Sequence, residues 1–278
     1  MPFAVALQFD GRPARLISEE AAGSAAAPGA PLVLFLAPYP LHGAAWEGLL
    51  GACAAAGFRA AAVDPPGFGG TPARGAPLGM DDLARLAAAS LDALGAARCA
   101  LVGCSMGGYG AMAFSRLFPE RLTALCLMNT KAAPDTAEQQ AGREAGAQLA
   151  LASGAAAAIG PLLPKLVAPG LEGRDPALWQ RVQALAAGAS AQGVADALRG
   201  MAARPDSAPA LRHCAAPALV VAGEHDQLMP LAVMEAIAGA LPRARLEVVA
   251  GAGHYAFLER PAEVAALLVG FLRETHRT

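Results

Sequence analysis

Short apolar runs of strand length alternate with helix-length stretches along most of this 278-residue chain. Parallel strands need long crossover connections, which helices usually provide, so this alternation predicts a mostly parallel sheet flanked by helices. The parallel strands are expected at 32–37, 58–64, 99–105, 122–129, 218–225 and 245–250. Helices are expected at 46–56, 80–94, 106–118, a run after Pro230, and 261–274.

Two earlier segments, 3–7 and 14–20, flank the turn sequence Asp-Gly-Arg-Pro. This pattern predicts an antiparallel hairpin at the edge of the sheet, which brings the total to eight strands. Residues 21–31, rich in alanine and glycine, are expected to link the hairpin to the first buried strand.

The strand pattern disappears from Lys131 to about Ser207, where the chain is alanine-rich and interrupted by prolines. We interpret residues 131–207 as an inserted helical cap, and residues 1–130 and 208–278 as an α/β core. The chain length is compatible with one large domain that carries such an insertion.

Charge and hydropathy exclude several classes of partner. The formal net charge is −2, from 21 basic and 23 acidic residues spread along the chain. No basic stripe is present for nucleic acid and no polybasic patch for a membrane surface. Long uncharged runs contain prolines and mostly alanine and glycine, and the start lacks the pattern of an export signal. We therefore expect a cytoplasmic protein that acts on a small molecule.

The cysteines give no sign of a metal site or a disulfide framework. Their number is odd and their spacing includes no Cys-x-x-Cys pair, so buried free thiols are expected. They are Cys53, Cys99, Cys104, Cys126 and Cys214.

The fragment Gly-Cys-Ser-Met-Gly at 103–107 lies where a predicted buried strand turns into a helix. This is a Gly-x-Ser-x-Gly nucleophile elbow in its required context. Large side chains at Gly103 and Gly107 would collide with the tight turn around Ser105. A serine hydroxyl is a weak nucleophile, so a histidine held by a carboxylate is expected elsewhere in the fold.

His254 is the preferred base among the five histidines because it lies in a glycine-rich loop between the last strand and the final helix. Asp226, just beyond the end of the preceding strand, is the preferred acid, with Glu224 as its nearest competitor. The chain order Ser105, Asp226, His254 matches one known fold.

With these motifs, and with "DPPGFGGT" after the second parallel strand, the chain resembles the α/β-hydrolase superfamily over nearly its whole length. The fragments "GCSMGG", "GEHD" and "AGAGHYAFLERP" resemble the capped serine esterase group, which includes bacterial carboxylesterases, 3-oxoadipate enol-lactonases and carbon–carbon bond hydrolases. The resemblance implies an α/β-hydrolase fold with a cap and a catalytic triad of Ser105, Asp226 and His254.

The resemblance also implies an oxyanion hole made of two backbone N–H groups. Met106, after the nucleophile, supplies one. The family pattern Leu-His-Gly-Phe-Pro, aligned through Pro40 and Trp46, puts Tyr39 at the second donor position. The visible His42-Gly43 pair is then off register, and the prolines on both sides of Tyr39 have no N–H.

We therefore expect a serine hydrolase that cleaves a small carboxylic ester or lactone through an acyl-enzyme and needs no metal or organic cofactor. Carbon–carbon bond hydrolysis, enol-lactonase, perhydrolase and acyltransferase reactions on the same triad stay open, as does a non-catalytic ligand-binding role. Residues 131–207 hold seven basic and seven acidic residues, which favours a mostly apolar, charge-neutral pocket. The sequence leaves open the oligomeric state and whether Arg143, Arg181 or Arg199 points inward.

Overall fold

The computed structural model describes residues 3–19 and 30–276. Its strands form one sheet in the order β1-β2-β4-β3-β5-β6-β7-β8, antiparallel at β1–β2 and β2–β4 and parallel elsewhere. They are β1 (Phe3–Phe9), β2 (Arg12–Glu19), β3 (Leu32–Leu36), β4 (Arg59–Val63), β5 (Cys99–Cys104), β6 (Leu122–Met128), β7 (Ala218–Gly223) and β8 (Ala244–Val249). The predicted mostly parallel, eight-stranded architecture is confirmed.

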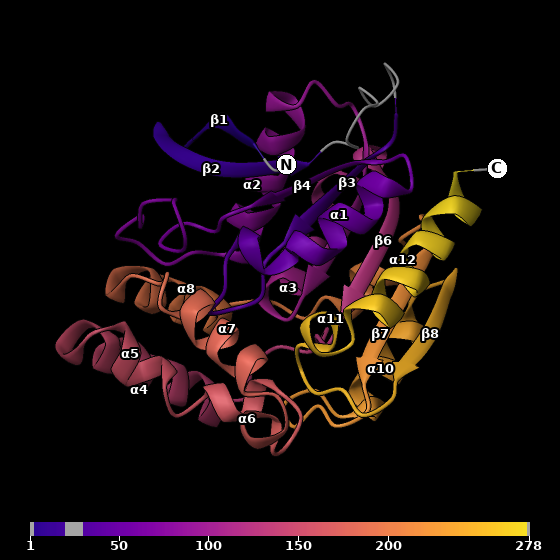
Figure 1. Ribbon diagram of the computed structural model, residues 1–278. Coiled ribbons are helices and arrows are strands. Elements are labelled where there is room, and N and C mark those ends of the chain that lie inside the picture. The colour runs from indigo at the N-terminus through magenta and orange to yellow at the C-terminus, as the bar shows by residue number, and fades with distance from the viewer. Residues whose placement is uncertain (1–2, 20–29, 277–278) are drawn as a thin grey trace.

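Helices cover both faces of the sheet (Figure 1), which explains why its central strands are apolar on both sides. All residues of β3, β5 and β7 are buried, whereas most of the edge strand β8 is only partly buried. Helices α1 and α12 pack together on one face, and α2 packs against α3 on the other. The core helices are η1 (Gly43–Trp46), α1 (Glu47–Ala55), α2 (Met80–Ala93), α3 (Met106–Leu117), η2 (Pro119–Arg121), α9 (Ala208–Leu211), α10 (Leu231–Ala240), α11 (Ala256–Glu259) and α12 (Pro261–Thr275).

The predicted edge hairpin is β1–β2. Its turn holds Asp10 at φ 51° and Gly11 at φ 70°, a left-handed pair that matches the twist of the two strands. Residues 20–29, which include most of the predicted linker and the end of the second predicted strand, lie outside the described residues.

The chain between β6 and β7 contributes no strand to the sheet. Figure 1 shows its helices α4 to α8 as a separate layer beside the sheet and its flanking helices. These elements are α4 (Ala137–Ser153), α5 (Ala155–Ile159), η3 (Leu163–Leu166), α6 (Leu171–Arg174), α7 (Pro176–Ala186) and α8 (Ala191–Ala202). The exact limits of a cap at 131 and 207 stay a prediction.

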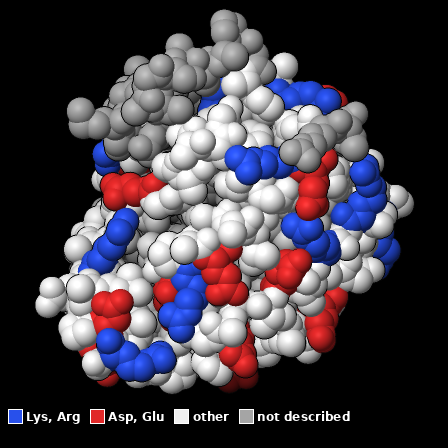
Figure 2. All heavy atoms as spheres, turned by 45° about the vertical axis from the view of Figure 1, so that its right-hand side comes forward, with Lys and Arg blue, Asp and Glu red and all other residues white. Residues whose placement is uncertain are grey.

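Charged side chains of both signs are interspersed over the face in Figure 2, as far as the structure describes it. No helix among the described residues is long and apolar enough to cross a membrane. The five cysteines are buried and unpaired, as predicted.

The parallel pairing brings the carboxyl ends of six strands, β3 to β8, to the same edge of the sheet, and site candidates follow five of them. Tyr39, Ser105, Asn129, Asp226 and His254 follow the ends of β3, β5, β6, β7 and β8, respectively. Ligands of open parallel sheets bind at this edge, so the fold collects residues that are distant in sequence.

Helix α8 lies directly on the core through Gly200. A Cβ atom at Gly200 would lie 1.7 Å from the carbonyl oxygen of Leu78, just before α2. No side chain fits between these two backbones, so glycine is required at this contact.

We expect Gly200→Ala to lower the free energy of unfolding by about 1–3 kcal/mol because α8 must move off Leu78. The matched control is Gly239→Ala, in α10, where a Cβ would meet no atom within 4 Å. That change should raise the same quantity by about 0.5–1 kcal/mol, since alanine favours helix. Urea denaturation measures both, and equal stability of the two variants would contradict the contact.

Candidate active site

Ser105 lies in a strained turn between β5 and α3. Its backbone has φ 51° and ψ −116°, a conformation that costs a non-glycine residue on the order of 1–3 kcal/mol. Two hydrogen bonds fix the turn from β6: the Ser105 amide donates to Met128 O at 3.1 Å, and the Thr130 hydroxyl donates to Ser105 O at 2.9 Å. The turn is therefore held by its neighbouring strand.

The two glycines of the motif stand where no side chain fits. A Cβ at Gly103 would lie 2.3 Å from Gly107 O, and one at Gly107 would lie 2.1 Å from Leu36 O. The beginning of α3 is thus pressed against both its own strand and the end of β3. This packing sets the height of Ser105 above the sheet edge.

The side chains of Asp226 and His254 are in contact beyond the carboxyl ends of β7 and β8. The distance from His254 Nδ1 to Asp226 Oδ2 is 2.8 Å, and both side chains are fully buried. With Nδ1–H donating to the carboxylate, the lone pair of the ring lies on Nε2. Within the described residues, Nε2 has no hydrogen-bond partner, so it is available to accept a proton.

The Asp226 carboxylate is held by more than the histidine. Oδ1 accepts the amides of Leu228 (2.8 Å) and Met229 (3.1 Å), and Oδ2 accepts Asn129 Nδ2 at 2.8 Å. Burial alone would raise the pKa of Asp226, but the hydrogen bonds, led by that of His254, lower it below its ordinary value. Asp226 therefore stays ionised at neutral pH.

Glu224, the competing acid, faces the surface. Its side chain is about half exposed, and Oε2 accepts the Gly251 amide at 2.8 Å. It stabilises the turn after β8 and does not contact the His254 ring.

Tyr39 lines the same cavity as Ser105. Its carbonyl oxygen accepts a 2.9 Å bond from the Tyr255 hydroxyl, which ties the loop after β3 to the residue next to His254. Leu41, an alternative donor in this loop, has its amide bound to Pro38 O at 2.7 Å. Met106 is the first residue of α3, where an N–H has no intrahelical acceptor. Tyr39 and Met106 as oxyanion donors stay a prediction.

The His42-Gly43 pair has a structural role. The Gly43 amide donates to Asp64 Oδ1 at 2.7 Å, and His42 Nδ1 lies 3.9 Å from the same oxygen. His42 does not line the cavity at Ser105. Trp46 is fully buried, and its ring stacks on that of Phe257 with 4.0 Å between the ring centres.

A cavity of about 360 Å³ opens above Ser105 and Tyr39. One side is apolar, with Leu162, Leu198 and Met229 in its wall; the other holds Lys131, Asp135 and Arg143. The expected charge-neutral pocket is therefore wrong. A balanced count over 131–207 does not tell which charges point inward.

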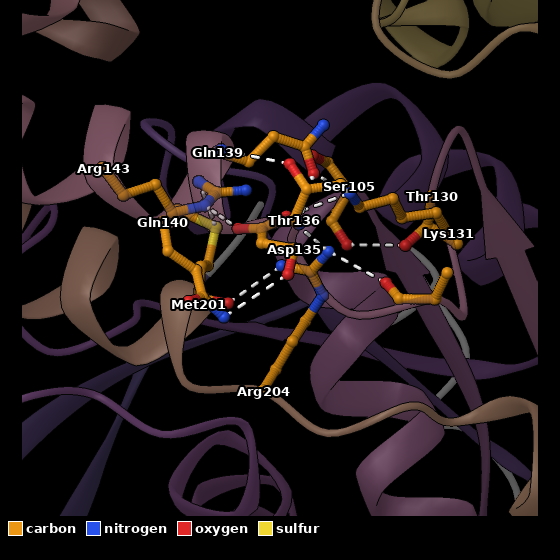
Figure 3. A network of polar contacts seen from close by, with 11 residues as sticks. Ser105, Thr130, Lys131, Asp135, Thr136, Gln139, Gln140, Arg143, Met201 and Arg204 are labelled. Atoms are coloured by element: carbon orange, nitrogen blue, oxygen red, sulfur yellow. Dashed lines mark hydrogen bonds and ion pairs between the residues drawn. The ribbon is translucent and has the colours of Figure 1, made fainter.

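Asp135 is the centre of a polar cluster on this wall (Figure 3). It forms ion pairs with Lys131 at 2.9 Å, with Arg204 at 2.8 Å, and with Arg143. Burial would raise the pKa of Asp135, but hydrogen bonds from Arg204, Arg143 and Lys131 lower it well below its usual range. The guanidinium of Arg204 also lies 4.1 Å from the ring centre of the buried Tyr109.

Sequence reasoning missed three supporting residues. Asn129 cannot itself provide a carboxylate, but its amide donates to the Asp226 carboxylate and can orient it. Tyr255 and Glu259 follow His254 in the same loop, and nothing in their spacing indicates their partners. Glu259 accepts the amides of Gly253 at 3.0 Å and Ala168 at 2.9 Å, and burial raises its pKa.

No group of three or more His, Cys, Asp or Glu side chains suited to a metal ion occurs within the described ranges. A serine in a strained strand-to-helix turn and a histidine bound to a carboxylate are the groups that nucleophilic attack by a hydroxyl requires.

A family model described as alpha/beta hydrolase fold matches residues 31–261 of the chain. A 2-hydroxy-6-oxononadienedioate/2-hydroxy-6-oxononatrienedioate hydrolase from Paraburkholderia phymatum is 30% identical over 248 residues, 80% of this chain and 78% of the relative. A protein of the same description from Burkholderia vietnamiensis is 46% identical over 78 residues, only 28% of this chain and 27% of that relative.

A thermophilic esterase from Thermogutta terrifontis, solved with malate bound, is similar over almost the full length. Its TM-score is 0.89 at 29% sequence identity, and the match covers 99% of each chain.

We expect Asp135→Asn to lower the free energy of unfolding at pH 7 by roughly 3–5 kcal/mol because it removes the ion-pair partner of the buried Arg204 guanidinium. The folded-state pKa of Asp135 is lowered, so its contribution is full above the unfolded value of about 3.9 and is lost as pH falls toward the folded value. Urea denaturation from pH 7 to pH 3 should show the wild-type advantage shrinking in the acid range. The exposed control Glu138→Gln should change little at any pH, and a pH-independent deficit in Asp135→Asn would contradict the ionic explanation.

Proposed function

Because the chain belongs to the α/β-hydrolase family, we propose that it is a serine hydrolase that cleaves a small carboxylic ester or lactone through an acyl-enzyme. The observation that carries the proposal is the buried 2.8 Å bond between His254 and Asp226, at the sheet edge where β5 ends in the Ser105 turn. A base with a fixed tautomer and a strained serine are what this reaction needs.

In the proposed cycle, Ser105 Oγ attacks the carbonyl carbon while His254 Nε2 takes the hydroxyl proton. The N–H groups of Tyr39 and Met106 stabilise the negative charge on the carbonyl oxygen. The tetrahedral intermediate collapses, and the imidazolium gives its proton to the departing alcohol. Water then attacks the acyl-enzyme by the same steps, with Asp226 orienting the ring and stabilising its charge throughout.

Residues 131–207 act in this proposal as the cap that shapes the substrate pocket. Arg143, Leu162 and Leu198 come from this segment and line the cavity above Ser105. The cavity volume of about 360 Å³ suits a small ester or lactone.

A second candidate is hydrolysis of a carbon–carbon bond. The Paraburkholderia relative is described as a hydrolase of an oxo-dienedioate, a compound that contains no ester, so hydrolysis beside its oxo group breaks a carbon–carbon bond. Faster turnover of a vinylogous diketone than of any ester or lactone in one panel would favour this candidate.

Ser105→Ala should lower kcat for p-nitrophenyl acetate by roughly 10⁶-fold, because no other group can form the acyl-enzyme. It should also abolish labelling by a fluorophosphonate. Ser115→Ala is the matched control. Ser115 is a buried serine of α3, the helix that follows Ser105, and its hydroxyl donates to Met112 O at 2.8 Å. Near-normal turnover by Ser105→Ala would remove Ser105 from the mechanism.

Asp226→Asn should lower kcat by about 10⁴-fold, because an amide in place of the carboxylate favours the wrong histidine tautomer. Glu224→Gln should change kcat by no more than a few-fold, since Glu224 contacts only the surface turn and the neighbouring His225. Steady-state kinetics on one p-nitrophenyl ester compares the two variants. The opposite order of effects would make Glu224 the acid.

A further inference from the structure

The polar wall of the cavity carries more positive than negative charge. Lys131, Arg143 and Arg204 surround Asp135, whose single carboxylate can neutralise only one of them. Every other residue that lines the cavity is uncharged. An excess of positive charge therefore faces the space above Ser105.

The members of this cluster differ in their access to the cavity. The side chains of Asp135 and Arg204 are 1% and 2% exposed, whereas those of Lys131 and Arg143 are 14% and 21% exposed. Lys131 and Arg143 line the cavity, but Arg204 does not. Asp135 also lines the cavity but is almost fully buried, so the two more accessible charged side chains on this wall are cations.

Arg204 makes several structural contacts in addition to its ion pair with Asp135. Besides Asp135, it donates to Met201 O at 2.8 Å and to Ala133 O at 3.0 Å, and it packs over the Tyr109 ring. These bonds join the start of the insertion to the end of α8. Arg204 is therefore the buried partner of the Asp135 carboxylate, and Lys131 and Arg143 are its more accessible partners.

Both accessible cations are held in place with donors to spare. Lys131 Nζ donates to Gln139 Oε1 at 2.9 Å, and Gln139 is fixed in turn by Thr136 at the start of α4. Arg143 bonds Asp135 through Nε and the Met201 sulfur through Nη1. Within the described residues Arg143 makes no hydrogen bond through Nη2, so the N–H donors of this nitrogen are available to a ligand.

We propose that Lys131 and Arg143 form a subsite for a substrate carboxylate, so that the preferred substrate is an anionic half-ester of a dicarboxylic acid. The inference rests on the proposed function. The carboxylate pairs with the two cations while the carbon chain lies against the apolar wall, with the ester at Ser105. A carboxylate fits because a guanidinium and an ammonium both donate charge-assisted hydrogen bonds to it.

Binding to Ser105→Ala tests the subsite without turnover. Isothermal titration compares monomethyl succinate, glutarate and adipate with methyl butanoate, pentanoate and hexanoate, which have a methyl group in place of the carboxylate. At least one half-ester should bind roughly 10- to 100-fold more tightly than its neutral counterpart. Equal binding across all pairs, or no binding of any half-ester, overturns the proposal.

Substitutions in the same background locate the effect. Arg143→Gln and Lys131→Gln should each reduce the ratio of half-ester to neutral-ester affinity by about 10-fold. Arg181→Gln is the control, because Arg181 lies on the exposed side of α7 and pairs with Glu47 at 3.2 Å. Retention of the ratio in both cavity variants, with melting temperatures near that of the parent, overturns the proposal.

Turnover by the unsubstituted enzyme separates the two proposals. Fluorophosphonate labelling of Ser105 and hydrolysis of neutral esters without anion preference would retain the serine hydrolase and reject the subsite. Tight half-ester binding with an unlabelled Ser105 would retain the subsite and reject the hydrolase.

Discussion

The backbone turn at Ser105 is the constraint on which the rest of the site depends. A left-handed residue between β5 and α3 is possible only because Gly103, Gly107 and Gly108 let three backbone segments come into contact. A Cβ at Gly108 would lie 2.6 Å from the Thr130 hydroxyl, the group that also bonds Ser105 O. The conformational strain of the turn is thus offset by close packing with β3 and β6, the same strands that carry Tyr39 and Asn129.

A second set of interactions keeps charge buried beside this turn. Burying the charged carboxylate of Asp226 would cost much free energy if its oxygens had no hydrogen-bond donors. The donors are Asn129, His254 and two backbone amides. All of these donors lie at the same edge of the sheet. These donors keep the carboxylate ionised, and the carboxylate in turn holds the imidazole in one tautomer. The order of the strands thus determines the charge state of the pair, because it brings the donors together.

The strands of the sheet could be predicted well because the apolar runs and turn residues that mark them are local features of the sequence. Buried parallel strands are continuous apolar runs. Each of the eight strands of the sheet, including the two of the antiparallel hairpin, was located within a few residues. Ser105, Asp226 and His254 could be predicted as a triad because strand ends and glycine-rich loops mark the functional edge of this fold, and their catalytic roles stay a prediction. Asn129, Tyr255 and Glu259 were missed because their roles depend on partners that no local pattern specifies.

The charged wall of the cavity could not be predicted for a different reason. Lys131, Asp135, Arg143 and Arg204 span more than seventy positions, and the insertion as a whole holds equal numbers of basic and acidic residues. Arg199 and Arg181, the other candidates considered from the sequence, pair with Glu144 and Glu47 outside the cavity. Only the packing of α4 against α8 decides which charges face the substrate.

Glu259 gives the site a mechanical property. Its carboxylate bonds the amides of Ala168 and Gly253, and a Cβ on Gly253 would lie only 2.2 Å from Ala168 N. The segment after η3 and the loop before His254 therefore cannot separate without breaking a buried bond or moving together. A displacement of the segment after η3 would therefore also strain the loop that carries His254. The positions of the helical layer and of the His254 loop are thus coupled through one carboxylate, and such a coupling acts equally in both directions.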